Sequence, residues 1–222
     1  MKYINTLLVS LLLLAASTSQ SFAASLTVIE KDQLVQSMAN DEEVIEFMYR
    51  SLQIGFVADI KSVNEVALTP EQSALHLSTI SKANVSGQSI KTNYPEFAAL
   101  NYSERKEILI DVATIVFKPE NMAAHKLGSC LWNALRGFLI CESITGAWTI
   151  TKYCICMAAV LGADMLNIEI IMAQGDLWLF EEETKLEHQA CVKIATGLFS
   201  KTSFQIVCPG YFVEHVWDCT NG

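Results

Sequence analysis

Seven cysteines are the residues of this 222-residue sequence whose chemistry is most distinctive, and all of them lie in its second half. They are Cys130, Cys141, Cys154, Cys156, Cys191, Cys208 and Cys219. Cysteines can form disulfides, hold a metal ion or supply a nucleophilic thiolate. In an oxidising compartment a spaced set first predicts a disulfide framework. The order of the cysteines leaves their pairing open, and an odd number leaves one thiol that could be buried, free, or bonded to a second molecule.

Cys154 and Cys156 are the closest pair, with one residue between them. On a helix their side chains would point about 200° apart, so they would join different partners. A redox-active pair usually has two intervening residues and a basic environment, and here only Lys152 is nearby. Zinc bound by Cys154, Cys156, His188 and Cys191 is a third alternative, although paired CxxC motifs are absent. We therefore predict structural disulfides and no metal site.

Catalysis by a nucleophile would need a histidine positioned by an acid. The histidines are His76, His125, His188 and His215. The densest cluster is Glu214-His215 followed by Asp218-Cys219, but proximity in sequence does not establish geometry. No GxSxG, HExxH, P-loop or GxGxxG motif occurs, and no EF-hand loop surrounds the acidic run 181–183. The sequence therefore predicts no catalytic residue and no cofactor, and it indicates a protein that is not an enzyme.

The first 23 residues are typical of a secretory signal peptide. Lys2 supplies the positive charge, residues 7–16 form an apolar run, and Ser21-Phe22-Ala23 gives a small-x-small cleavage site. The apolar run is shorter than the roughly 18 residues that span a bilayer. We predict cleavage after Ala23 and a secreted or periplasmic protein.

Composition excludes several classes of protein. Hydrophobic residues make up 51% of the chain and charged residues only 18%, which is too apolar for a disordered protein. Fifteen Lys and Arg against 24 Asp and Glu give a net charge of −9, with no basic cluster. Nucleic acid is therefore not expected as a partner, because its binding requires clustered cations. An unidentified protein or a membrane is the expected partner.

The cysteine-free half is predicted to consist of helices joined by turns. Asp41 can cap a helix whose apolar face would be formed by Ile45, Met48, Leu52, Phe56 and Ile60. Thr69-Pro70-Glu71-Gln72 has the pattern of a second helix start, and that helix is expected through Ala83. Residues 84–93 contain Ser86-Gly87 and lack sustained periodicity, so they predict a loop.

A third helix is predicted from a capping box formed by Asn101 and Glu104. Its apolar stripe would contain Leu109, Val112, Ala113 and Val116, and Pro119 would close it. The segment 118–128 combines a proline, polar residues and a glycine at the point where the cysteine content changes. We place there the boundary between a cysteine-free helical region, 24–127, and a cysteine-rich helical domain, 128–222.

The cysteine-rich half is also predicted to be helical. A helix starting near Ser129 and ending near Gly146 would carry Cys130 and Cys141 on one face. Residues 147–173 are nearly continuously apolar, and their charges favour a buried helix over a membrane span. A further helix is expected from Asp176, and a disulfide through Cys219 would hold the C-terminal end. The predicted fold class is therefore mainly α, with a disulfide-stapled apolar C-terminal half.

The run YPEFAALNYSERKE at residues 94–107 resembles a segment of a group of uncharacterised, small exported bacterial proteins. In that group it leads into a C-terminal cysteine-rich helical domain. The layout is also similar to halocin-type bacteriocin precursors, in which a C-terminal cysteine-rich apolar peptide is released from an N-terminal half. The resemblance implies an exported chain in two parts, and it implies no set of catalytic residues.

Two functions follow as expectations. The first is a bacteriocin-like precursor whose disulfide-stabilised C-terminal unit acts on a membrane or a membrane partner. Its charge opposes this, because residues 128–222 carry five Lys or Arg and ten Asp or Glu, and an acidic peptide is repelled by anionic lipids. The alternative is a non-catalytic extracytoplasmic binding or structural module held by disulfides.

Overall fold

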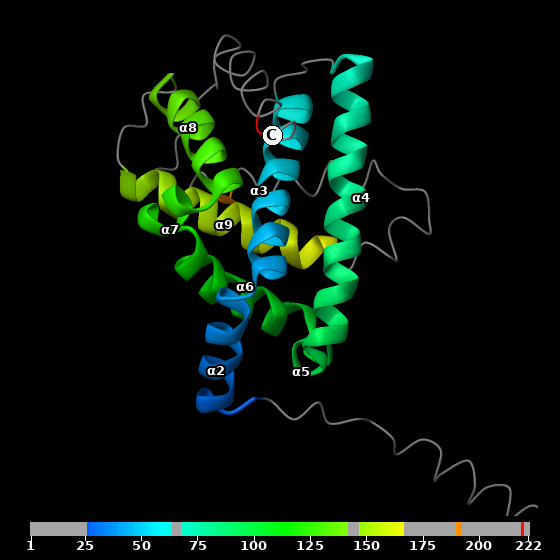
Figure 1. Cartoon of the computed structure of the whole chain (residues 1–222), viewed down its shortest axis with the longest axis vertical. Coiled ribbons are helices and arrows are strands. Elements are labelled where there is room, and N and C mark those ends of the chain that lie inside the picture. The colour runs from blue at the N-terminus through cyan, green and yellow to red at the C-terminus, as the bar shows by residue number, and fades with distance from the viewer. Residues whose placement is uncertain (1–25, 64–67, 142–146, 167–189, 192–218, 220–222) are drawn as a thin grey trace, which may run out of the picture.

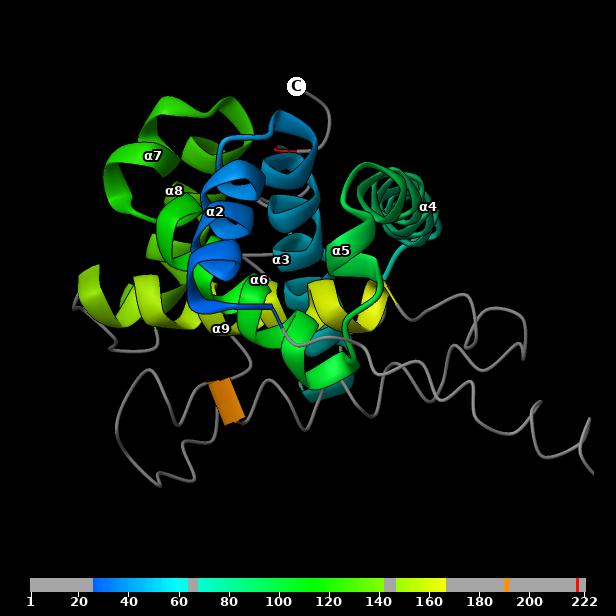
Figure 2. The same cartoon turned by 90° about the horizontal axis from the view of Figure 1, so that it is seen from below.

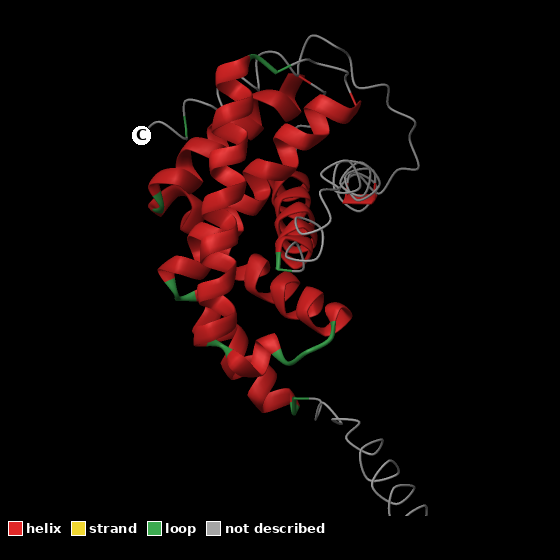
Figure 3. Ribbon diagram, turned by 90° about the vertical axis from the view of Figure 1, so that its right-hand side faces the viewer, coloured by secondary structure: helices red, strands yellow, loops and turns green. Residues whose placement is uncertain are grey.

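The computed structural model describes residues 26–63, 68–141, 147–166, 190–191 and 219. All regular secondary structure within these ranges is helical (Figure 3). The mainly α fold expected from the apolar periodicity is thus confirmed. The helices are α2 (Val28–Ala39), α3 (Glu42–Val63), α4 (Pro70–Asn93), α5 (Pro95–Ala98), α6 (Tyr102–Val116), α7 (Pro119–Ala124), α8 (Lys126–Cys141) and α9 (Ala147–Met165).

The arrangement of the helices centres on α3 and α9. Helix α9 crosses α3 and also packs along α6, while α4 stands beside α3 (Figure 1). Helix α2 packs on α6, and α7 packs on α8. The view from below separates α4 from the group formed by α7 and α8, with α3 and α6 between them (Figure 2). Helices from both sides of the predicted boundary at 118–128 are therefore in direct contact.

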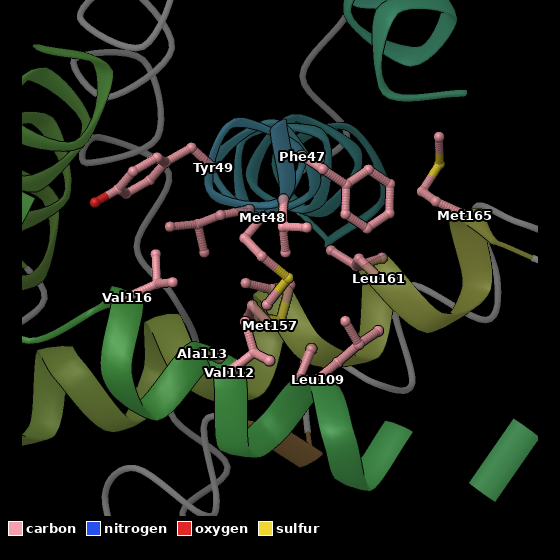
Figure 4. Packing of buried hydrophobic residues seen from close by; sticks show 14 of the residues in the cluster. Phe47, Met48, Tyr49, Leu109, Val112, Ala113, Val116, Met157, Leu161 and Met165 are labelled. Carbon is pink, nitrogen blue, oxygen red and sulfur yellow. The ribbon is translucent and has the colours of Figure 1, made fainter. Parts of the chain in front are cut away.

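The core is built where α3, α6 and α9 meet (Figure 4). Each helix contributes fully buried side chains from one face: Phe47, Met48 and Leu52 from α3, Leu109, Val112 and Ala113 from α6, and Met157, Ala158 and Leu161 from α9. Burying such side chains stabilises the fold by about 1.5–3 kcal/mol for each large one. The predicted stripes of the first and third helices are confirmed where their side chains are described.

Local capping explains where several helices begin. Thr69 and Gln72 form a capping box at α4, and Asn101 and Glu104 form another at α6, as predicted. A third box, Thr27 with Glu30, starts α2, which the sequence analysis did not single out. Asp41 caps α3 by accepting a hydrogen bond from the Glu43 amide at 2.8 Å.

The loop predicted for residues 84–93 is wrong, because α4 continues to Asn93. Its buried residues Ile80, Ala83, Gly87 and Ile90 repeat every three or four positions. Gly87 belongs to this face and lies against Leu166 and Phe47, which a β-carbon at Gly87 would approach to 3.3 and 3.5 Å. The glycine thus serves close helix packing, and tertiary contacts offset its low helix propensity.

The segment 118–128 is itself largely helical. It contains α7 and the first residues of α8, which begins at Lys126 rather than near Ser129. Pro119 is the first residue of α7, where its missing amide hydrogen costs nothing.

A buried helix was predicted over residues 147–173, and the described part of that run, α9, is mostly buried where its side chains are described. Between Tyr153 and Leu166, every residue except Ile155, Cys156 and Asp164 is buried. Among the described residues, no helix is both long and apolar enough to cross a membrane. The predicted signal peptide, the end of the α8 helix near Gly146 and the helix from Asp176 lie outside the described residues, apart from the helical pair 190–191.

Candidate functional site

Four of the predicted disulfide candidates are joined in two pairs. Cys130 of α8 bonds to Cys219, across 89 residues and a Cα–Cα distance of 5.6 Å. Cys156 of α9 bonds to Cys191, across 35 residues and 5.5 Å. The first disulfide ties Cys219, three residues from the end of the sequence, to α8, as the sequence suggested. Disulfides therefore staple the apolar C-terminal half.

Cys154 is a buried free thiol. It is fully enclosed, and burial raises its pKa far above the ordinary value for a thiol. The thiol therefore stays protonated and shielded, which is the opposite of an activated nucleophile. Cys156, its neighbour in sequence, has its sulfur in the disulfide with Cys191, so neither of those two sulfurs can serve as a thiolate ligand for zinc.

Several sequence candidates are outside the described part of the chain. These are Cys208, His188, the acidic run 181–183 and the cluster of Glu214, His215 and Asp218. Cys141 is the last residue of α8, but its side chain is also outside the described set. Within the described ranges, no group of three or more His, Cys, Asp or Glu side chains could hold a metal ion.

A pocket of about 320 Å³ opens where α3, α6 and α7 approach one another. Its lining residues come from the end of α2, the first turns of α3, the end of α6, and α7 with the residue that follows it. They are Ala39, Asn40, Glu42, Ile45, Tyr49, Ile115, Val116, Asn121, Ala124 and His125. The volume is at the lower end of the range that is usual for small-molecule sites.

The polar centre of the pocket is a contact between His125 and Glu42. His125 Nε2 lies 3.0 Å from Glu42 Oε1, and the Gly128 amide donates a hydrogen bond to His125 Nδ1 at 3.3 Å. Because Nδ1 accepts that bond, the ring proton must sit on Nε2, which donates to the carboxylate. Both ring nitrogens of His125 are therefore engaged within the protein.

Tyr49 forms the wall behind His125. The two rings stack with their centroids 4.8 Å apart, and Phe117 packs edge-on against Tyr49 at 5.3 Å. The Tyr49 hydroxyl lies over the backbone of Gly128, where an added β-carbon would stand only 2.5 Å away. Burial raises the pKa of Tyr49, with smaller contributions from Cys154 and Glu42, so the phenol is neutral.

The sequence analysis counted His125 among the histidines but did not connect it with Glu42 or Tyr49. These residues are 76 or more positions apart, and no local spacing pattern joins them. The sequence analysis singled out Gly128, but only as part of the predicted boundary. In the structure its missing side chain lets the α8 backbone approach Tyr49. Comparison with protein-family models, with curated proteins and with solved structures finds no match to this chain.

Proposed function

We propose that this chain is an exported, non-catalytic binding module whose two halves act as one body. The observation that carries the proposal is the position of α9, which comes from the cysteine-rich half and packs between α3 and α6 of the cysteine-free region. Met157, Ala158 and Leu161 of α9 are fully buried there. Separating the halves would expose this apolar surface to water.

The pocket supports binding rather than acid–base chemistry. A general base needs a lone pair that can reach the substrate. In His125 the Nδ1 lone pair accepts the Gly128 amide hydrogen, and the Nε2 proton faces Glu42. The imidazole is thus held as part of the wall, and the Glu42 carboxylate beside it is exposed to solvent.

Export is supported by two features of the chain. The first 23 residues have the pattern of a cleaved signal peptide. The disulfides Cys130–Cys219 and Cys156–Cys191 would persist in an oxidising compartment and are rare in a reducing one.

Mass analysis of the exported protein under non-reducing conditions tests the proposal against the bacteriocin-like precursor. Both described disulfides join cysteines that follow residue 128, so neither of them would hold a fragment produced by cleavage at 118–128 to the N-terminal region. We expect an intact chain that starts near Ala24. Accumulation of a C-terminal fragment that starts between residues 118 and 128, and inhibits growth of related bacteria, would overturn the proposal in favour of the precursor.

A further inference from the structure

Three hydrogen bonds around the pocket are made within the protein itself. His125 Nε2 donates to Glu42 at 3.0 Å. Asn40 Nδ2 donates to the Gln36 carbonyl oxygen at 2.7 Å, and Asn121 Nδ2 donates to the Ile115 carbonyl oxygen at 2.8 Å. Each of these amides keeps a second N–H and its Oδ1, so the group that would select the charge of a ligand is the Glu42 carboxylate.

The acceptors lie beside apolar surface. Ile45 of α3 and Ile115 and Val116 of α6 line the same pocket, together with Ala39 and Ala124. Only one oxygen of Glu42 is within hydrogen-bond distance of His125, and the Glu42 side chain is 78% exposed. A ligand can therefore reach the carboxylate while its carbon skeleton contacts Ile45 and Ile115.

We propose that the pocket binds the ammonium group of a small amine whose remaining body is apolar. The ammonium ion would supply the donors and the positive charge that Glu42, Asn40 and Asn121 can accept, while the body displaces water from the apolar wall. The net charge of −9 raises the local concentration of cations around the protein. This inference rests on the proposed binding function and names the class of ligand.

The test uses the full exported chain and three probes of similar shape and different charge: 2-phenylethylammonium, 2-phenylethanol and phenylacetate. Amide chemical shifts recorded during titration would locate each probe and give its dissociation constant. We expect the ammonium probe to bind most tightly, with the largest shifts at residues 42–49 and 121–128. The neutral alcohol should bind more weakly and the carboxylate weakest.

Three variants separate the effect of the pocket's charge from that of its shape. Glu42→Gln keeps the size of the side chain and removes its charge, and an exposed ion pair predicts a loss of about two- to fivefold in affinity for the ammonium probe. Glu96→Gln on α5 removes the same charge from an exposed site that does not line the pocket, and should leave the affinity unchanged. Ala124→Leu narrows the pocket from an exposed position and should weaken all binding there.

The outcomes distinguish this inference from the proposed function. Equal affinity for the alcohol and the ammonium probe, or no effect of Glu42→Gln, would overturn the ammonium class. Shifts confined to another surface, or no saturable binding of any probe, would overturn the pocket as a site. The proposed single-body function is tested separately by mass analysis of the exported chain, so either conclusion can fail alone.

Discussion

The backbone of Gly55 on α3 lies directly against the Leu161 side chain of α9. A β-carbon added at Gly55 would overlap Leu161 Cδ1 and stand 3.0 Å from Met157 Cε. An alanine at this position would therefore require the Leu161 side chain to shift within the core. This contact joins the cysteine-free region to the cysteine-rich half.

Gly55→Ala should therefore destabilise the protein, although alanine favours a helix. Overpacking costs about 1–3 kcal/mol, of which about 1 kcal/mol is recovered from helix propensity. We expect a net loss of up to about 2 kcal/mol in the free energy of unfolding, measured by urea denaturation with circular dichroism. Gly87→Ala is the matched control, because its β-carbon would stay at least 3.3 Å from its neighbours and should change stability by less than about 1 kcal/mol. If Gly55→Ala proved as stable as Gly87→Ala, the close approach would be wrong.

Features encoded over a few residues could be predicted from the sequence. The capping residues Thr69 and Asn101 give their helices the correct starts, because a side-chain oxygen and a backbone amide three residues away are sufficient. The predicted loop around Gly87 fails because the contacts of that glycine lie on α3 and beyond α9, far away in sequence. The missing signal was tertiary packing, which overrides local propensity.

The candidate site depended even more on long-range structure. His125 and Glu42 are 83 residues apart, and their contact requires α3 and α7 to be placed first. The pairing of the cysteines likewise depends on packing between segments that are far apart in the sequence. The sequence showed that Cys154 and Cys156 would diverge on a helix, but only packing shows that Cys156 meets Cys191 while Cys154 stays buried as a thiol.

Loss of either disulfide should destabilise the folded chain. The chain-entropy relation gives about 4 kcal/mol for the 35-residue separation of Cys156 and Cys191, and about 4.5 kcal/mol for the 89-residue separation of Cys130 and Cys219. Paired alanine variants of each disulfide, compared by urea denaturation, should show losses of this order. Cys154→Ala removes a buried sulfur without removing a cross-link and should cost only about 1 kcal/mol. A paired variant no less stable than Cys154→Ala would contradict a structural role for that disulfide.

The buried thiol of Cys154 should be inert until the protein unfolds. Burial raises its pKa, so the reactive thiolate does not form at neutral or mildly alkaline pH. We expect that iodoacetamide at pH 8 leaves Cys154 unmodified in the native, unreduced protein and alkylates it in denaturant, as followed by peptide mass analysis. Rapid alkylation of Cys154 in the native protein would show that it is accessible.

Stability should fall at high pH. The pKa values of Cys154 and Tyr49 are raised in the folded state, so above about pH 9 the unfolded chain loses protons that the folded protein retains. The free energy of unfolding should decrease by up to about 1.4 kcal/mol per pH unit for each group, first for Cys154 and then for Tyr49. Cys154→Ala should remove the first part of this decrease, between about pH 9 and 10. An identical slope in the variant would mean that other groups cause the loss.

Two tyrosine hydroxyls form hydrogen bonds between segments that are distant in sequence, and the two bonds differ in their exposure to water. Tyr94 is buried and donates to Asp41 Oδ2 at 2.8 Å, and Asp41 also caps α3. Tyr102 is 38% exposed and donates to Asp164 Oδ1 at 2.7 Å. A bond to a charged acceptor contributes about 1.5–3 kcal/mol when shielded and less when water can replace it. Tyr94→Phe should therefore cost about 1.5 kcal/mol, whereas Tyr102→Phe should cost under about 1 kcal/mol in the same urea denaturation experiment. The reverse order would show that the bond between Tyr102 and Asp164, which ties the start of α6 to the end of α9, stabilises the folded chain more than the bond from Tyr94 to Asp41 does.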